Sequence, residues 1–128
     1  MKPHILVVDD DQYSRELTTK LLKADGYAVS GATNGEEALQ RVARDLPDLV
    51  LMDLSLPVLD GWETARRIKA QTSGTSIPII ALTAHAMRGD RQRAIDCGCD
   101  EYVAKPLDYA LLRAKIDAML GREPGACG

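Results

Sequence analysis

The residues of this chain best suited to chemistry are three consecutive aspartates, a fourth aspartate, a threonine and a lysine. They are Asp9-Asp10-Asp11, Asp53, Thr83 and Lys105. Crowded carboxylates repel one another, and a hard divalent cation such as Mg²⁺ relieves the repulsion because it prefers oxygen ligands. An aspartate can be a nucleophile that forms an aspartyl-phosphate, while lysine and threonine bind the phosphoryl oxygens. The set predicts magnesium-dependent phosphoryl transfer, which requires mainly positioning and charge neutralisation.

Alternating strand-like and helix-like segments must bring these residues together. Continuous apolar runs with β-branched residues are typical of strands buried on both faces, and amphipathic stretches between them predict helices. The expected strands are residues 5–8, 27–32, 49–52, 77–82 and 102–104, and the expected helices are 14–24, 34–46, 62–70, 85–97 and 109–120. This alternation predicts the α/β class: a five-stranded parallel sheet, doubly wound, with helices on both faces.

Apolar stripes and capping residues give the helices their expected faces and ends. The stripes predicted to pack on the sheet are Leu17, Leu21 and Leu22 in the first helix, and Ala38, Leu39, Val42 and Leu46 in the second. Gly26 is expected to end the first helix, Pro47 to end the second, and Asp108 to cap the last.

The reactive residues follow the first, third, fourth and fifth expected strands. Ligands of open parallel sheets bind beyond the carboxyl ends of the strands, so we expect these residues at one edge. Each also has a plainer interpretation. The aspartate triplet and Thr83 can cap helices, Asp53 can be a turn residue, and Lys105 can be a solvated loop charge. Capping does not explain why four strands lead into them together.

Composition limits the function classes. A length of 128 residues favours one domain, here residues 1–121 with a short flexible tail at 122–128. A net charge of −3 argues against direct nucleic-acid binding. The absence of an eighteen-residue apolar run or a signal peptide favours a cytoplasmic protein that does not cross a membrane. Three cysteines, an odd number, argue against a disulfide framework.

Four motifs in this order and spacing resemble the response-regulator receiver (chemotaxis-Y-like) family across residues 4–120. They are Ile5-Leu-Val-Val-Asp-Asp-Asp11, Leu49-Val-Leu-Met-Asp-Leu-Ser-Leu-Pro57 with Asp60-Gly61, Pro78-Ile-Ile-Ala-Leu-Thr-Ala84, and Lys105-Pro106. The resemblance implies a doubly wound, flavodoxin-like (βα)5 three-layer sandwich with the strand order 2-1-3-4-5. The segment from Ala84 to Asp90, with Gly98-Cys99, further resembles single-domain cell-cycle receivers of the DivK type and receivers of hybrid sensor kinases.

The resemblance implies a stand-alone two-component response regulator, phosphorylated by a histidine kinase or a histidine phosphotransfer protein. Asp53 is then the phosphoacceptor, and phosphorylation switches partner binding. The implied ligands of Mg²⁺, with Mn²⁺ as a substitute, are Asp10, Asp53 and the backbone carbonyl of Ser55, and Asp9 would act on the metal largely through water. Thr83, the Ala84 backbone N–H and Lys105 would bind the phosphoryl group, with Thr83 and Tyr102 as the switch pair. A downstream protein would bind the face of the fourth helix, fifth strand and fifth helix.

Other functions fit the residues less well. A haloacid-dehalogenase-like phosphatase expects a second acid two residues after the nucleophile, where Ser55 stands. A flavodoxin-like carrier is disfavoured because the acidic first loop would repel FMN phosphate, and no glycine-rich fingerprint supports a dinucleotide site. The chain is expected to phosphorylate and dephosphorylate itself without turning over small substrates. A phosphorylation-independent interaction scaffold remains open.

Overall fold

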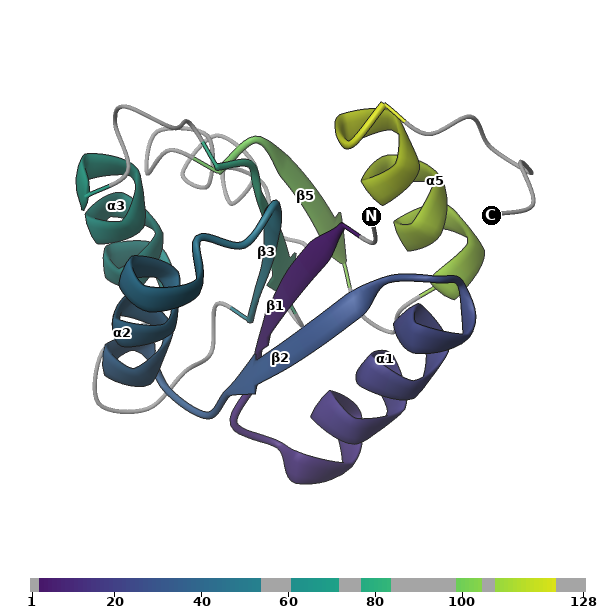
Figure 1. Ribbon diagram of the computed structural model, residues 1–128, viewed down its shortest axis with the longest axis horizontal. Helices are drawn as coiled ribbons and strands as arrows, with labels where there is room; N and C mark the ends of the chain where they lie inside the picture. The colour runs from purple at the N-terminus through teal and green to yellow at the C-terminus, as the bar shows by residue number, and fades with distance from the viewer. Residues whose placement is uncertain (1–2, 54–60, 72–76, 84–98, 105–107, 122–128) are drawn as a thin grey trace.

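The fold is a five-stranded parallel sheet between two layers of helices (Figure 1). The computed structural model describes residues 3–53, 61–71, 77–83, 99–104 and 108–121. The strands are β1 (His4–Val8), β2 (Ala28–Ala32), β3 (Leu49–Asp53), β4 (Ile79–Thr83) and β5 (Glu101–Ala104). The helices are α1 (Gln12–Ala24), α2 (Gly35–Asp45), α3 (Gly61–Gln71) and α5 (Tyr109–Met119). The helix expected at residues 85–97 lies outside the described residues.

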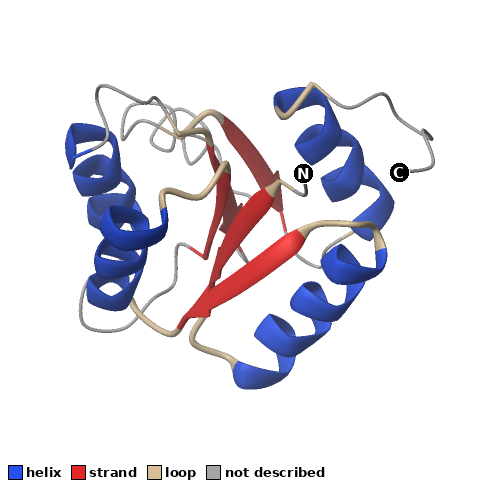
Figure 2. Ribbon diagram, viewed as in Figure 1, coloured by secondary structure: helices blue, strands red, loops and turns tan. Residues whose placement is uncertain are grey.

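The strand order is β2-β1-β3-β4-β5, so the predicted topology is confirmed. Apolar side chains cover both faces of the sheet. One cluster joins the sheet to α2 and α3 through Ala38, Val42 and Ile68, and a second joins it to α1 and α5 through Leu22 and Leu112. Figure 2 shows these helix pairs on opposite sides of the strands. All five residues of β3 are buried, as a central strand covered on both faces requires.

The apolar stripe predicted for α1 was partly wrong. Leu22 is buried, but Leu17 is 47% exposed and Thr18 is buried in its place. Thr18 and Leu22 are four residues apart and share one helix face, and this face, not that of Leu17, points to the sheet. In α2, Ala38 and Val42 are buried as expected, whereas Leu46 is 57% exposed. It is the C-cap of α2, with a left-handed φ of 45°, and the chain leaves the helix there.

The predicted helix ends are largely confirmed. Gly26 has a φ of 92° directly after the C-cap of α1, a conformation that glycine adopts without steric cost. Asn34 caps α2 by accepting from the Glu37 N–H, and Asp108 caps α5 by accepting from the Leu111 N–H. The expected strand at 77–82 begins two residues later, because Pro78 has no N–H to donate, although its carbonyl accepts from the Val50 N–H.

Side-chain hydrogen bonds tie the helices to the sheet at the edge where the strands begin. The Lys69 Nζ atom donates to Asp100 Oδ2 at 2.6 Å and to the Ile77 carbonyl at 2.8 Å. On the other face, the buried Tyr27 hydroxyl donates to Asp117. The Tyr109 hydroxyl donates to Asp25 at 2.6 Å, which joins α5 to the end of α1. These bonds fix α3 and α5 against the sheet.

None of the helices within the described ranges is both long enough and apolar enough to cross a lipid bilayer.

Candidate functional site

Three aspartates meet at the edge where the strands end. Asp9 follows β1, Asp10 comes next, and Asp53 is the last residue of β3. Val8 is paired with Met52 in the sheet, so the two strands end side by side. Carboxylate oxygens of Asp9, Asp10 and Asp53 lie within 4.8 Å of one another, and we call this group the carboxylate cluster. The edge that holds it is the lower one in Figure 1, where β1 leads towards α1.

The aspartate triplet divides into two functions. Asp11 is the N-cap of α1, because its carboxylate accepts from the Tyr13 N–H at 3.3 Å and from the Ser14 hydroxyl at 2.9 Å. The capping interpretation is therefore correct for Asp11. Asp9 and Asp10 instead belong to the carboxylate cluster. Asp9 and Asp53 are each 4% exposed and Asp10 is exposed, so the cluster opens to solvent at Asp10.

The backbone around Asp9 is held on three sides. The Asp9 N–H donates to the Ala32 carbonyl at 3.0 Å, which extends the pairing of β1 with β2 beyond the last strand residue. The Asp9 Oδ1 atom accepts from the Asp11 N–H at 2.9 Å. Arg15 reaches back from α1 and donates from Nη1 to the Asp9 carbonyl at 2.8 Å. The carboxylate of Asp9 is thus fixed before any ligand binds. The contact of Arg15 with the Asp9 backbone was not predicted from the sequence.

The other predicted site residues lie in or directly after β3, β4 and β5. Asp53 is paired with Leu82 and Thr83 with Ala104, so the backbone of Thr83 is at the same edge as the cluster. Tyr102 is half-buried and packs against the apolar cluster beneath α2 and α3. Ser55, Ala84 and Lys105 lie outside the described residues, and their assigned roles stay predictions.

The donor set of the cluster suits a hard divalent cation. It offers only carboxylate oxygens, and three negative charges within 4.8 Å attract a small cation strongly. Magnesium is commonly bound by one or two carboxylates plus waters and phosphate oxygens, and the exposed side at Asp10 leaves room for those. The residues present therefore fit Mg²⁺, and an aspartate beside such an ion is suited to accept a phosphoryl group.

Comparison with known proteins decides the family. The profile of the response regulator receiver domain matches residues 5–117, which is most of the chain. The chain belongs to the response regulator receiver domain family. As a receiver domain it is a signalling module of two-component systems with the CheY-like fold, and not a conventional turnover enzyme. The narrower likeness to DivK-type receivers rests mainly on residues outside the described ranges and stays a prediction.

Several relatives support this membership. The receiver is 42% identical over 118 residues to the response regulator MprA of Mycobacterium leprae, covering 92% of this chain and 51% of that protein. The chain therefore spans about half the length of this curated relative. A putative response regulator from Chloroflexus aurantiacus has a TM-score of 0.89 and 32% identity, covering 95% of this chain and 100% of that one.

One solved structure bears on the metal. The receiver domain of the sensor histidine kinase PA1611 from Pseudomonas aeruginosa is described with a magnesium ion coordinated in its active-site cleft. It has a TM-score of 0.86 and 37% identity, covering 94% of this chain and 99% of that chain.

Proposed function

We propose that this receiver accepts a phosphoryl group on Asp53, with Mg²⁺ bound at the carboxylate cluster, and that phosphorylation changes which protein it binds. The observation that carries the proposal is the meeting of Asp9, Asp10 and Asp53 within 4.8 Å at the carboxyl ends of β1 and β3. The magnesium-bound relative supports the same cation here. Mn²⁺ is the expected substitute, because it also prefers oxygen ligands.

Asp53 would act as the nucleophile. One of its carboxylate oxygens attacks the phosphorus of a phosphohistidine, the new O–P bond forms, and the P–N bond breaks with its electron pair returning to the imidazole. Asp9 and Asp10 would hold the cation from the β1 side, together with Asp53 and the Ser55 carbonyl. When bound, the cation would neutralise charge on the transferring phosphoryl group. The fixed backbone of Asp9 means that little reorganisation accompanies the reaction.

The ends of β4 and β5 would sense the modification. Thr83, the Ala84 N–H and Lys105 would bind the phosphoryl oxygens, because each supplies a donor beyond a neighbouring strand. Phosphorylation adds roughly −1.5 to −2 charges. Drawing Thr83 towards that charge would favour an inward position of Tyr102, which already packs on the apolar cluster. The phosphoryl group thereby biases an existing two-state element.

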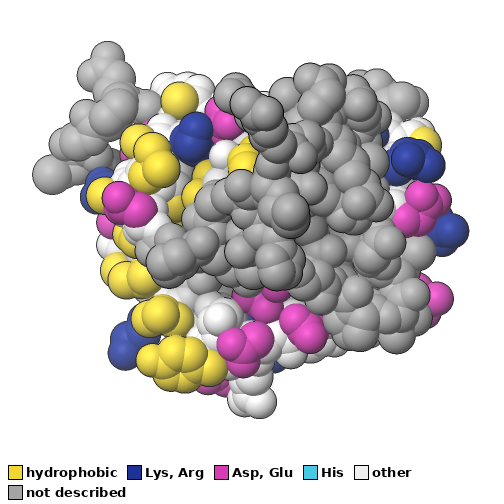
Figure 3. All heavy atoms as spheres, turned by 180° about the vertical axis from the view of Figure 1, so that it is seen from behind, with side chains coloured by type: hydrophobic (Ala, Val, Ile, Leu, Met, Phe, Trp, Pro, Cys, Tyr) yellow, Lys and Arg dark blue, Asp and Glu magenta, His cyan; other side chains and the backbone are white. Residues whose placement is uncertain are grey.

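Exposed apolar side chains beside the cluster suggest where the phosphodonor docks. Tyr13 is 75% exposed and Leu17 is 47% exposed, and they lie four residues apart on one face of α1. The N-cap of this helix, Asp11, is next to the cluster, so a protein bound to this face can present a phosphohistidine to Asp53. Figure 3 shows hydrophobic side chains gathered on the side of the molecule formed by α1 and α5. We propose a histidine kinase or a histidine phosphotransfer protein as this donor.

The remaining parts of the proposal follow from the family. The downstream target would be a protein that binds the face of the fourth helix, β5 and α5, with neither nucleic acid nor membrane contacted directly. Residues 1–121 would act as a cytoplasmic receiver. Its own chemistry would be limited to self-phosphorylation and autodephosphorylation.

Self-phosphorylation tests the proposal. The protein is incubated with acetyl phosphate and MgCl₂ and its intact mass is measured, beside Asp53→Ala and the distant cap variant Asp108→Asn. We expect one phosphoryl adduct in the wild type and in Asp108→Asn, none in Asp53→Ala and none with EDTA. If no adduct accumulates, beryllium fluoride binding distinguishes rapid hydrolysis from inactivity. Failure of both would support the phosphorylation-independent scaffold.

A further inference from the structure

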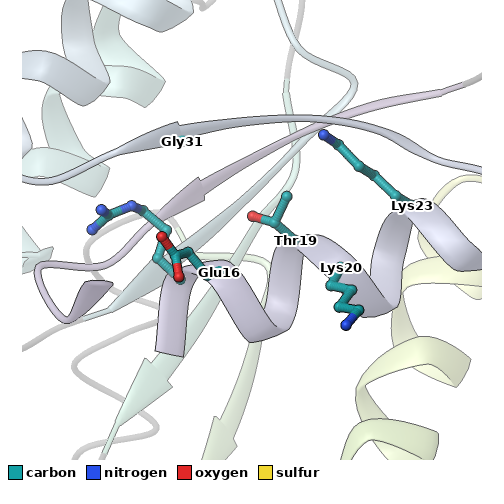
Figure 4. Close-up of a pocket in the computed structure, with 6 residues that line it drawn as sticks. Glu16, Thr19, Lys20, Lys23 and Gly31 are labelled. Atoms are coloured by element: carbon teal, nitrogen blue, oxygen red, sulfur yellow. The ribbon is translucent and has the colours of Figure 1, made fainter. Parts of the chain in front are cut away.

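A groove separates α1 from the free edge of β2 (Figure 4). Its volume is about 420 Å³, and it is lined by Arg15, Glu16, Thr19, Lys20, Lys23 and Gly31. Thr19 and Lys23 reach from α1 towards β2. Gly31 leaves room for the Arg15 side chain, because a Cβ atom at this position would lie 3.2 Å from Cδ of Arg15.

The groove runs along backbone groups that the sheet leaves unpaired. β2 is the first strand in the sheet order and has β1 as its single neighbour in that order. The Ala28 N–H donates to Pro3 and the Ala32 carbonyl accepts from Asp9, so these two residues direct their polar groups towards β1. Successive residues of a strand alternate in direction, so Val29 and Gly31 direct theirs outward. No residue in the described ranges hydrogen-bonds to those outward groups.

The charges around the groove are mainly positive. Arg15, Lys20 and Lys23 line it, and among the residues with described positions no carboxylate forms an ion pair with any of them. Glu16 is the one acid of the lining, and it accepts from Gln12 on its own helix. Cations gathered at one groove of a chain with net charge −3 favour an anionic partner. Two copies paired edge to edge would bring these cations together, which disfavours self-association.

We propose that this groove binds an extended acidic segment of a partner protein, which adds to the edge of β2 as a sixth strand. The backbone of that segment would pair with the outward groups of Val29 and Gly31. Alternate side chains would face α1, where carboxylates meet Lys23 and Lys20 beside the Thr19 hydroxyl. Main-chain pairing gives affinity and the alternate side chains give specificity, as in other strand-addition complexes. The binding of this segment does not require phosphorylation of Asp53.

The probe is an end-blocked eight-residue peptide of alternating Glu and Val, titrated into ¹⁵N-labelled protein at low salt. We expect saturable shifts of the Val29 and Gly31 amide signals, with slowed hydrogen exchange at both. A matched peptide of alternating Lys and Val should not bind. Lys23→Glu should weaken binding by about tenfold, whereas Arg66→Glu, an equal charge change on α3, should leave the affinity unchanged.

Val29→Pro separates strand addition from simple charge attraction. The substitution removes one outward N–H and keeps the pairing with β1. An edge strand tolerates proline at a position whose N–H faces solvent. We expect Val29→Pro to abolish peptide binding, with unfolding in urea confirming that it folds. Unchanged binding in a folded Val29→Pro, or wild-type binding without exchange protection at Val29 and Gly31, would overturn the proposal. So would the absence of binding to the acidic peptide. If Val29→Pro does not fold, the exchange data on the wild type decide.

Discussion

The guanidinium of Arg15 donates a 2.8 Å hydrogen bond to the carbonyl oxygen of Asp9, so a side chain of α1 holds the backbone beside the carboxylate cluster. The contact has two opposing electrostatic effects. It fixes the direction of the Asp9 carboxylate, which favours cation binding. It also places a positive charge near the cluster, which opposes it.

Arg15→Ala reveals which effect dominates. We expect positioning to dominate, with a loss of Mg²⁺ affinity of about tenfold, as for other residues that orient metal ligands. Arg15→Lys, which keeps the charge and a donor, should lose less. Gly31→Ala should shift Arg15 slightly and cause a smaller loss in the same direction, because its Cβ would lie 3.2 Å from Cδ of Arg15. Isothermal titration with MgCl₂ measures the affinities, and tighter binding by Arg15→Ala would show that charge dominates.

Substitutions of the neighbouring residues Asp10 and Asp11 should differ in their effect on the stabilisation by Mg²⁺. Mg²⁺ at about 100 times its Kd should raise the free energy of unfolding of the wild type by about 2.7 kcal/mol. Asp10→Asn should lose most of this gain, because Asp10 belongs to the cluster. Asp11→Asn should keep it, since asparagine caps helices as well as aspartate does. Urea unfolding with and without MgCl₂ tests both variants, and an equal loss in the two would count against the division of functions.

Tyr109 should make the free energy of unfolding depend on pH in the alkaline range. Burial, with the hydrogen bond and negative charge of Asp25, raises the pKa of Tyr109 above its ordinary value. The unfolded chain then loses this proton at a lower pH than the folded chain. The stabilisation is therefore complete below about pH 10 and is lost as the pH rises through the folded pKa.

Tyr109→Phe removes both the hydrogen bond and its titration. It should lower the free energy of unfolding by about 1 kcal/mol at pH 8. The difference from the wild type should shrink as the pH rises above 10. Urea unfolding between pH 8 and pH 11 measures it, and a difference that stays constant or grows would contradict the assignment.

Two ion pairs that involve α3 differ in their surroundings and should differ in how much they contribute to the free energy of unfolding. Lys69 is 23% exposed and bonds to both Asp100 and the Ile77 carbonyl, whereas Arg67 is 54% exposed and pairs with Glu63 on its own helix. Lys69→Met should therefore lower the free energy of unfolding by about 1–2 kcal/mol, because it leaves a carbonyl and a carboxylate without this donor. Arg67→Met should cost less than about 0.5 kcal/mol. Thermal or urea unfolding compares them, and equal costs would refute this ranking.

The cluster was predictable because its positions depend on local patterns and one general rule. Apolar runs mark the strands that lead into Asp9 and Asp53, and parallel strands present their carboxyl ends at one edge. The choice between Leu17 and Thr18 was not predictable from spacing. Leu17 with Leu21 and Thr18 with Leu22 are equally spaced pairs, and only the packing on the sheet decides between them.

Contacts between distant parts of the chain were also outside the reach of sequence patterns. The Tyr27 hydroxyl and Asp117 are 90 residues apart, and neither stands in a motif. Arg15 reads as an ordinary charge on a solvated helix, and its contact with Asp9 depends on the angle at which α1 leaves the sheet. Such contacts arise from tertiary geometry, which no local pattern encodes.

The direction of the elements has a practical consequence for handling the protein. β1 begins, and α5 ends, at the edge opposite the carboxylate cluster, because α5 runs antiparallel to the strands it follows. A fluorophore, affinity tag or surface tether attached through either end of the described chain would therefore leave from the far side. Protein held from that side would present the carboxylate cluster to the bulk solution.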